Sequence, residues 1–261
     1  MHRFVETRRD GAVEYLTLNR PDVRNAFNQK LIHELRQWAD AVSADKAVRV
    51  VVLAGAGSAF CAGADLAWMA EMASYPQADN EADARAAAQM YAALDGLPVP
   101  VIGRIHGAAL GGGAGLVALC DVAVAEEHTT FGFTEVKVGI VPAIVSPYVL
   151  AKIGTSAARQ LFLTGIRFDA VRAKEIGLVH EIVTASDLDT RVTEYVEEVL
   201  GAGPEAVAVA KRLLKEIQGR SAQDVMELTT ATIAARRSSA EGQEGLRAFL
   251  EKRKVTWNIS R

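Results

Sequence analysis

Apolar and polar positions follow two patterns along the chain, and together they predict strands and helices in turn. Apolar runs of strand length predict buried strands at Ala12–Leu18, Val48–Leu53, Pro100–His106 and Val122–Ala125. The segment Gln29–Val42 has helical spacing instead, and one face of it would carry the apolar side chains of Leu31, Ile32, Leu35, Trp38, Ala39 and Val42. Strands that alternate with helices imply crossover connections, so the pattern predicts an α/β protein with a largely parallel sheet.

One polar segment interrupts this alternation. Residues Glu71–Asn80 are mostly polar and contain Pro76, so we expect a loop there, followed by an alanine-rich helix over Glu81–Leu94. The loop is either a solvated linker or a mobile wall over a ligand pocket.

After Gly203 only helical patterns remain, which predicts a core over residues 1–200 and a helical region over residues 201–261. Pro204 suits a first helical turn, and Ser221 and Ser239 are candidate N-caps. Apolar side chains would give these helices faces that pack either on their own core or on another subunit: Val225, Leu228, Ile233, Leu246, Phe249 and Leu250.

Composition narrows the function classes. The 261 residues are half apolar, enough for a large core, and the net charge of −3 gives no electrostatic footprint for nucleic acid or an anionic membrane. No apolar stretch reaches membrane-spanning length, and the N-terminus lacks the apolar region of a signal peptide, so we expect a cytoplasmic protein. Cys61 and Cys120 lack metal-ligand spacing, which predicts two core thiols in a reducing compartment.

The main candidate for chemistry is the glycine-rich stretch of residues 107–116, which lies between a predicted strand and a helix-like run. Free N–H groups at such a helix start can bind a phosphate or a developing oxyanion. The dinucleotide fingerprint fails here because Leu116 occupies its third glycine position, and it fails again at Phe60 in the glycine-containing turn after Val48–Leu53. The chain also contains no P-loop and no G-x-S-x-G elbow.

That second turn, residues 54–66, also joins a predicted strand to a helix start. Two such corners on neighbouring strands could aim two backbone N–H groups at one point, which is the geometry of an oxyanion hole. The alternative is that these glycines only permit close packing of helix on strand.

Several segments in order along the chain resemble one family. The segments Phe60–Leu66 and Gly107–Gly113 look like the two signatures of the crotonase superfamily, the enoyl-CoA hydratase/isomerase family. Further matching segments are Leu18–Ala26, Phe131–Pro142, Leu163–Gly165, Ala173–Val179 and Phe249–Arg253. The resemblance implies a spiral of ββα turns with a C-terminal helical region, a homotrimer or a dimer of trimers, and an acyl-CoA substrate without a metal or redox cofactor.

Residue roles follow from the same resemblance. The backbone N–H groups of Ala64 and Gly112 would form the oxyanion hole, and Glu135 would be the acid/base. The substrate-binding positions would be Arg24, Ala26, Ala62, Asp65, Leu66, Gly111, Thr134, Pro142, Phe249 and Lys252.

The chain departs from the family pattern at Gly115, where hydratases commonly present a first glutamate. Glu135 would then act alone, or with a group that the sequence does not identify. We therefore keep three hypotheses: a hydratase that adds water to a 2-enoyl-CoA, a Δ3,Δ2-enoyl-CoA isomerase with a single proton shuttle, and a non-catalytic acyl-CoA-binding scaffold. The run Val141–Tyr148 resembles the methylglutaconyl-CoA-type hydratases and favours the first.

Glutamates are mostly exposed, so Glu135 could also be an ordinary surface residue. A base that works near neutral pH would benefit from a raised pKa, and apolar surroundings are suggested by Phe131, Phe133, Val136 and Val138.

Other polar and large side chains near the motifs allow two interpretations each. Asp65 is more simply a helix cap than a catalytic group, and His106 is more simply structural. The side chains of Trp68, Met69 and Met72 either line an acyl pocket or pack in the core.

The sequence does not identify the acyl group of the substrate. A carboxylated substrate would need a cation, for which Lys137 and Arg104 are candidates.

Overall fold

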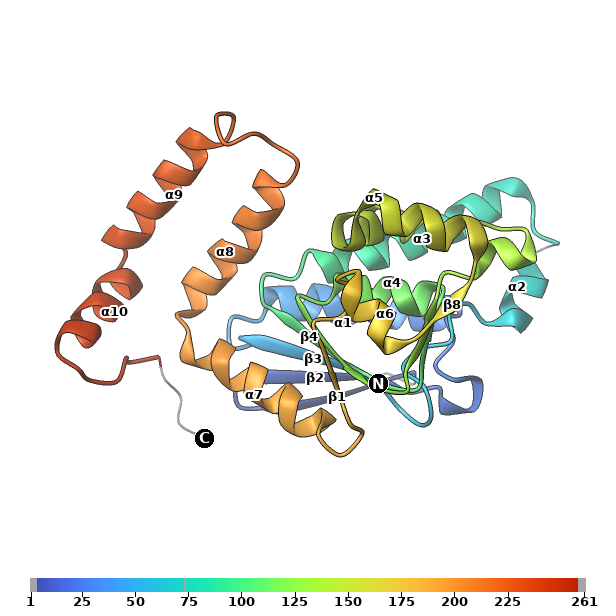
Figure 1. The fold of residues 1–261 in the computed structure, drawn as a ribbon, viewed down its shortest axis with the longest axis horizontal. Helices are drawn as coiled ribbons and strands as arrows, with labels where there is room; N and C mark the ends of the chain where they lie inside the picture. The colour runs from blue at the N-terminus through green and yellow to red at the C-terminus, as the bar shows by residue number, and fades with distance from the viewer. Residues whose placement is uncertain (1–3, 73, 258–261) are drawn as a thin grey trace.

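The computed structural model describes residues 4–72 and 74–257 and has a mixed α/β architecture (Figure 1). Its main sheet has six strands in the order β1-β2-β3-β4-β6-β9. Their bounds are β1 Val5–Asp10, β2 Val13–Leu18, β3 Val50–Gly55, β4 Val101–Ile105, β6 Val122–Glu126 and β9 Glu181–Val183. Among the described strands of this sheet only β1 and β2 pair antiparallel, so the α/β class with a largely parallel sheet is confirmed.

A second, three-stranded sheet stands beside the first and has the order β5-β7-β8. Its strands are short: β5 Ala108–Leu110, β7 Thr130–Gly132 and β8 Arg167–Phe168. Since β5 follows β4 almost directly, the chain passes from one sheet into the other at residues 106–107, where the glycine-rich stretch begins.

The main sheet is buried on both faces, as a parallel sheet requires. Successive side chains of a strand point to opposite faces, and on β3 Val51 and Leu53 enter one apolar cluster while Val50 and Val52 enter another. The first and larger cluster is shared with α1 Gln29–Ala44, α3 Gln77–Asp95, α4 Gly112–Leu119, α5 Ser146–Thr164 and α6 Ala170–Glu175. The second is closed by α7 Leu188–Gly201 on the opposite face (Figure 1).

The predicted amphipathic helix is confirmed as α1. All six predicted side chains of its apolar face are buried. The side chain of Asn28 caps the helix by accepting a hydrogen bond from the Leu31 N–H at 2.9 Å.

The prediction of a loop over the whole of Glu71–Asn80 is wrong, because helices enter this segment from both sides. Helix α2 covers Leu66–Met72, and α3 begins already at Gln77, directly after Pro76. Proline fixes the backbone before the first helical turn and its own missing N–H costs nothing there, so a polar composition alone did not prevent helix formation.

The C-terminal helices α8 Pro204–Ile217, α9 Met226–Ser238 and α10 Ala240–Leu250 extend away from the layered core (Figure 1). Pro204 opens α8 as predicted, and Ser239 caps α10 by accepting from the Gly242 N–H at 3.0 Å. The predicted cap at Ser221 is wrong, because α9 starts at Met226 and the Ser221 hydroxyl instead closes a turn with Asp224.

Both cysteines are free and buried, and burial raises the pKa of each thiol to about 12, as core thiols require. Over the described residues, none of the helices is both long and apolar enough to cross a membrane.

Candidate active site

The two glycine-containing corners predicted from the sequence lie against each other. The N–H of Cys61 donates to the carbonyl of Ala108 at 3.0 Å, and the N–H of Leu110 donates to the carbonyl of Cys61 at 2.9 Å. A Cβ at Gly113 would lie only 2.2 Å from the Cys61 carbonyl oxygen, so a glycine is required for this contact. The glycines therefore serve close packing, and the same packing brings the two helix starts together.

The backbone at Ala64 and Gly112 leaves N–H groups available on these corners. Ala64 bridges Phe27 in parallel fashion, and the bridge uses the Gly63 carbonyl (2.7 Å) and the Asp65 N–H (2.8 Å). The N–H of Ala64 therefore points away from Phe27. Gly112 is the first residue of α4, where an N–H has no partner within the helix, and the α4 macrodipole adds partial positive charge there.

A turn before α1 supports the first corner. The buried Asn25 side chain donates to the carbonyls of Ala56 and Ala59, both at 2.8 Å, and its backbone takes the left-handed conformation at φ 57°.

An ion pair supports the same corner. Arg20 pairs with Asp65 at 2.9 Å and donates to the carbonyl of Ala26. Asp65 also accepts from the Ala67 N–H at 3.0 Å, so the predicted helix-capping role is confirmed.

Glu135 lies beside the second corner, at the start of a short 3-10 helix over Glu135–Val138. A Cβ on Gly111 would lie 3.3 Å from one Glu135 carboxylate oxygen, and the other oxygen, Oε2, is buried without a hydrogen-bond partner in the described chain. Burial raises the pKa of this carboxyl group. A partly buried carboxyl group with a free oxygen and a raised pKa is suited to proton transfer.

A cavity of about 320 Å³ opens from Ala64, Gly112 and Glu135. Its walls come mainly from three segments, to which Phe27 and Ile32 add: Trp68, Met69 and Met72 of α2, Asp83, Ala87 and Tyr91 of α3, and residues 140–145, which include Pro142. The α2 side chains thus line a pocket instead of only packing in the core. The lining is mostly apolar, as expected for the acyl part of a ligand.

The missing side chain at Gly115 has a steric explanation. A Cβ there would lie 2.3 Å from a methyl carbon of Val145 and 3.2 Å from a ring carbon of Tyr91. Val145 therefore occupies the space that a glutamate at position 115 would need.

The apolar surroundings of Glu135 differ from those suggested by the sequence. Phe131 and Phe133 are fully buried in the larger apolar cluster, where Phe131 stacks on Phe168 and Phe133 packs edge-on against Phe162, and Val138 is 62% exposed. The apolar walls come instead from α2, α3 and residues 140–145, whereas the two phenylalanines point into the core.

A second cavity of about 530 Å³ meets the first at Ala64. It collects most of the predicted substrate-binding positions: Arg24, Ala26, Ala62, Asp65, Leu66 and Thr134. Phe249 and Lys252 belong to the C-terminal helical region and line neither cavity.

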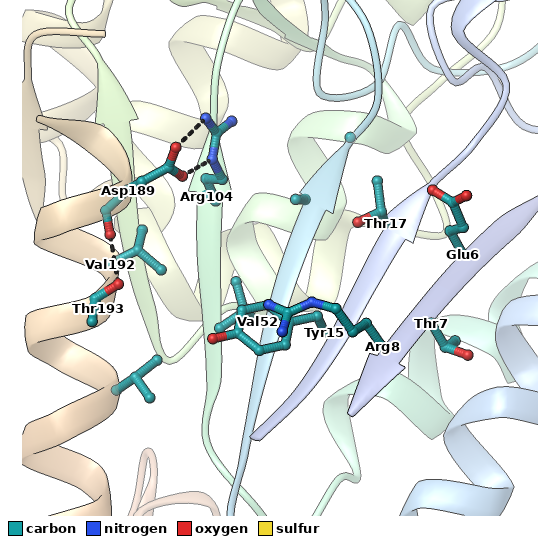
Figure 2. Close-up of a pocket in the computed structure, with 13 residues that line it drawn as sticks. Glu6, Thr7, Arg8, Tyr15, Thr17, Val52, Arg104, Asp189, Val192 and Thr193 are labelled. Atoms are coloured by element: carbon teal, nitrogen blue, oxygen red, sulfur yellow. Dashed lines mark hydrogen bonds and ion pairs between the residues drawn. The ribbon is translucent and has the colours of Figure 1, made fainter. Parts of the chain in front are cut away.

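The two candidate cations for a carboxylated substrate also lie elsewhere. Arg104 pairs with Asp189 in a third cavity, between the main sheet and α7 (Figure 2). Lys137 is exposed and packs near Gly165, and neither cation lines the apolar cavity.

The His106 ring contacts the carbonyl of Gly57 at 2.9 Å, in agreement with a structural role.

Three residues of the site were not singled out from the sequence. Asn25 lies within a recognised segment, and its tolerance of left-handed backbone was the available signal. Tyr91 donates from its hydroxyl to the carbonyl of Gly112 at 2.6 Å, and Asp83 occupies a buried position of α3. Asp83 could have been found as a charged residue in phase with Met90 and Tyr91 on one helical face.

No group of three or more His, Cys, Asp or Glu side chains in the described parts of the chain could hold a metal ion.

Comparisons with known proteins agree with one another, and each match covers nearly the whole chain. The family description "Enoyl-CoA hydratase/isomerase" matches residues 8–260. The crystal structure of an enoyl-CoA hydratase from Shewanella pealeana is similar with a TM-score of 0.94 and 37% identity, covering 98% of this chain and 96% of that chain. The 2,3-dehydroadipyl-CoA hydratase of Escherichia coli is 32% identical over 246 residues, 94% of this chain and 94% of that protein. The crotonyl-CoA hydratase of Syntrophomonas wolfei is 30% identical over 244 residues, 93% of each chain.

Proposed function

This chain belongs to the enoyl-CoA hydratase/isomerase family and is a hydratase-like enzyme, and we propose that Ala64, Gly112 and Glu135 add water across the 2,3 double bond of an enoyl-CoA. The relatives named above are hydratases, so the isomerase alternative is not favoured. Gly115, which suggested that alternative, is accounted for by the steric demand of Val145.

In the proposed mechanism the thioester carbonyl accepts hydrogen bonds from the N–H groups of Ala64 and Gly112. Negative charge grows on this oxygen as the enolate forms, so both hydrogen bonds strengthen in the transition state. One such donor is worth about 2.7–4 kcal/mol of barrier. The N-terminal end of α4 adds a favourable field at the same point.

Glu135 performs both proton transfers in this proposal. Its carboxylate accepts a proton from a water molecule while the water oxygen bonds to C3 and the π electrons move toward the thioester. The resulting acid then returns a proton to C2 as the enolate collapses, so the product has gained one water and Glu135 is again a carboxylate. These steps use only the thioester, water and groups of the chain.

The bound substrate would extend through both cavities. We place the acyl chain in the apolar cavity and the pantetheine arm in the second cavity along Arg24, Ala26, Ala62, Asp65, Leu66 and Thr134. Gly111 and Pro142 would border the thioester and the acyl chain. Phe249 and Lys252 would reach the CoA of a neighbouring subunit in a homotrimer or a dimer of trimers.

The observation that supports this proposal best is that Glu135 lines the same cavity as Ala64 and Gly112 and that its buried Oε2 has no hydrogen-bond partner among the described residues. We expect Glu135→Gln to lower kcat for crotonyl-CoA hydration by about 10²–10⁴-fold, the usual contribution of general acid–base catalysis, while CoA binding is retained. Mass spectrometry of the product and loss of enoyl absorbance measure the reaction.

Glu197→Gln, which alters an exposed glutamate of α7, is the matched control and should leave turnover unchanged. Wild-type turnover by the Glu135→Gln protein would contradict the proposed role of Glu135.

A further inference from the structure

The inner face of α3 contains one residue that the packing of the fold does not explain. The buried residues of this helix are Asp83, Met90, Tyr91 and Leu94, which share one helical face by their spacing. Asp83 is only 6% exposed, so a carboxyl group occupies a position where the pattern of the helix calls for an apolar side chain.

The Asp83 carboxyl group is only half satisfied. One oxygen accepts a long hydrogen bond of 3.5 Å from the Gln29 side chain. The other, Oδ2, is buried without a hydrogen-bond partner among the described residues, and burial raises the pKa of the group. Burying such a group costs free energy unless something pairs with it, so the fold alone gives no reason for it.

Asp83 belongs to the wall of the same apolar cavity that opens from Glu135. The Tyr91 hydroxyl of that wall is already used by the Gly112 carbonyl. Tyr91 follows Asp83 by eight residues of the helix, or about 12 Å along the axis, which separates Asp83 from the oxyanion corner. Asp83 therefore borders the part of the cavity that would hold the acyl chain away from the thioester.

We propose that Asp83 is a specificity-determining residue that selects acyl chains with a hydroxyl group beyond the reacting double bond. This inference rests on the proposed function, since it assigns the acyl chain to that cavity. A hydroxyl group both donates and accepts, so it pairs with the carboxylate or with the protonated acid.

An acyl chain with its own carboxylate would instead place two anions together. No lysine or arginine in the described part of the chain lines this cavity, so nothing there would neutralise the second charge. An unsubstituted chain would leave Oδ2 of Asp83 buried and unpaired. Of these three classes of acyl chain, the hydroxylated one would give the Asp83 carboxyl group a hydrogen-bond partner without adding a second charge.

The test measures kcat/KM for pairs of 2-enoyl-CoAs of increasing length, one member unsubstituted and the other with a terminal hydroxyl. At the length that reaches Asp83, the wild-type protein should prefer the hydroxylated member by about tenfold or more, because a site built to pair with a hydroxyl rejects the analogue that lacks it. Asp83→Leu should reduce this ratio to about one while it still hydrates the unsubstituted chains.

Two further variants separate specificity from stability. Asp83→Asn keeps a group that can donate and accept, so it should retain a preference for the hydroxylated chain. Asp79→Asn alters an exposed carboxylate one turn earlier on α3 and should behave as wild type. Asp83→Leu should also raise Tm, because it removes a buried, half-paired carboxyl group.

The outcomes distinguish the two proposals. A wild-type protein that hydrates no 2-enoyl-CoA would overturn the proposed function itself. Hydration of unsubstituted and hydroxylated chains at equal rates for every length, or the same preference in Asp83→Leu as in the wild type, would overturn this inference and leave the hydratase assignment intact. Faster hydration of a carboxylated chain, such as 2,3-dehydroadipyl-CoA, than of the hydroxylated chains would also overturn it.

Discussion

At the scale of single residues, Gly115 and Val145 form a pair whose volumes are matched. A Cβ at position 115 would lie 2.3 Å from a Val145 methyl carbon, so Gly115→Ala should overpack the core and lower the free energy of unfolding by about 1–3 kcal/mol. Val145→Gly alone should also destabilise, because it leaves a cavity.

Combined, the two changes should cost clearly less than the sum of the single costs, since each removes the cause of the other's strain. Urea denaturation of the four proteins measures this coupling. Strict additivity would mean that Val145 does not occupy the space required at position 115.

The pH dependence of catalysis belongs to the residue scale as well. A general base works as the carboxylate. Therefore kcat/KM should have its full value above the pKa of Glu135 and should fall as the pH drops through that pKa. Burial raises that pKa, so the acid limb should lie above the pKa of about 4.3 of an ordinary glutamate.

A pH–rate profile with crotonyl-CoA measures this limb. Asp83→Asn should keep the limb where it is, which separates Glu135 from the other carboxyl group of the cavity whose pKa is raised. An acid limb that moved in Asp83→Asn would assign the titration to Asp83.

Much of the candidate site could be predicted from sequence because its essential groups lie on glycine-rich backbone. The corners at 54–66 and 107–116 have a composition that shows where backbone N–H groups are free, and the structure brings them together. Tyr91 and Asp83 could not be assigned in this way. Their importance depends on which side of α3 faces the cavity and on the position of α3 against residues 140–145, which are tertiary properties.

At the scale of elements, the helix caps provide a direct comparison. The Ser239 hydroxyl accepts from the Gly242 N–H at 3.0 Å and caps α10, whereas Ser221 lies in an exposed turn before α9. We expect Ser239→Ala to lower the free energy of unfolding by about 1 kcal/mol and Ser221→Ala to change it by less than half as much. Chemical denaturation measures both. Equal effects would show that the α10 cap adds nothing beyond an ordinary turn.

Elements were predictable from the sequence where a strand is buried on both faces or a helix has one apolar face. The buried strands β2, β3, β4 and β6 and the helix α1 each left an apolar pattern in the sequence. Strand β1 did not, because five of its six residues are exposed on an edge strand. The strands β5, β7 and β8 are two or three residues long, too short for any periodicity to appear.

At the scale of the whole molecule, the C-terminal helices present apolar surface that the other described residues do not cover. Phe249 is 82% exposed and Leu250 is 80% exposed, and α8 and α9 have no buried residues. Large apolar side chains as exposed as these are typical of a protein–protein contact. Together with the absence of Phe249 and Lys252 from both cavities, it supports an assembly in which these residues serve a neighbouring subunit.

Replacing the two apolar side chains by charges tests this assembly. If the proposed trimer or hexamer forms through this surface, Phe249→Asp combined with Leu250→Asp should shift the mass in solution to that of the monomer, because burying two carboxylates in an apolar interface is costly. It should also raise KM for the CoA substrate, since the neighbour's contribution is lost. Light scattering after gel filtration measures the mass, and Glu198→Ala on the exposed side of α7 is the control. A monomeric variant with the wild-type KM would show that each subunit binds CoA alone, and a mass unchanged from the wild type would contradict an assembly through Phe249 and Leu250.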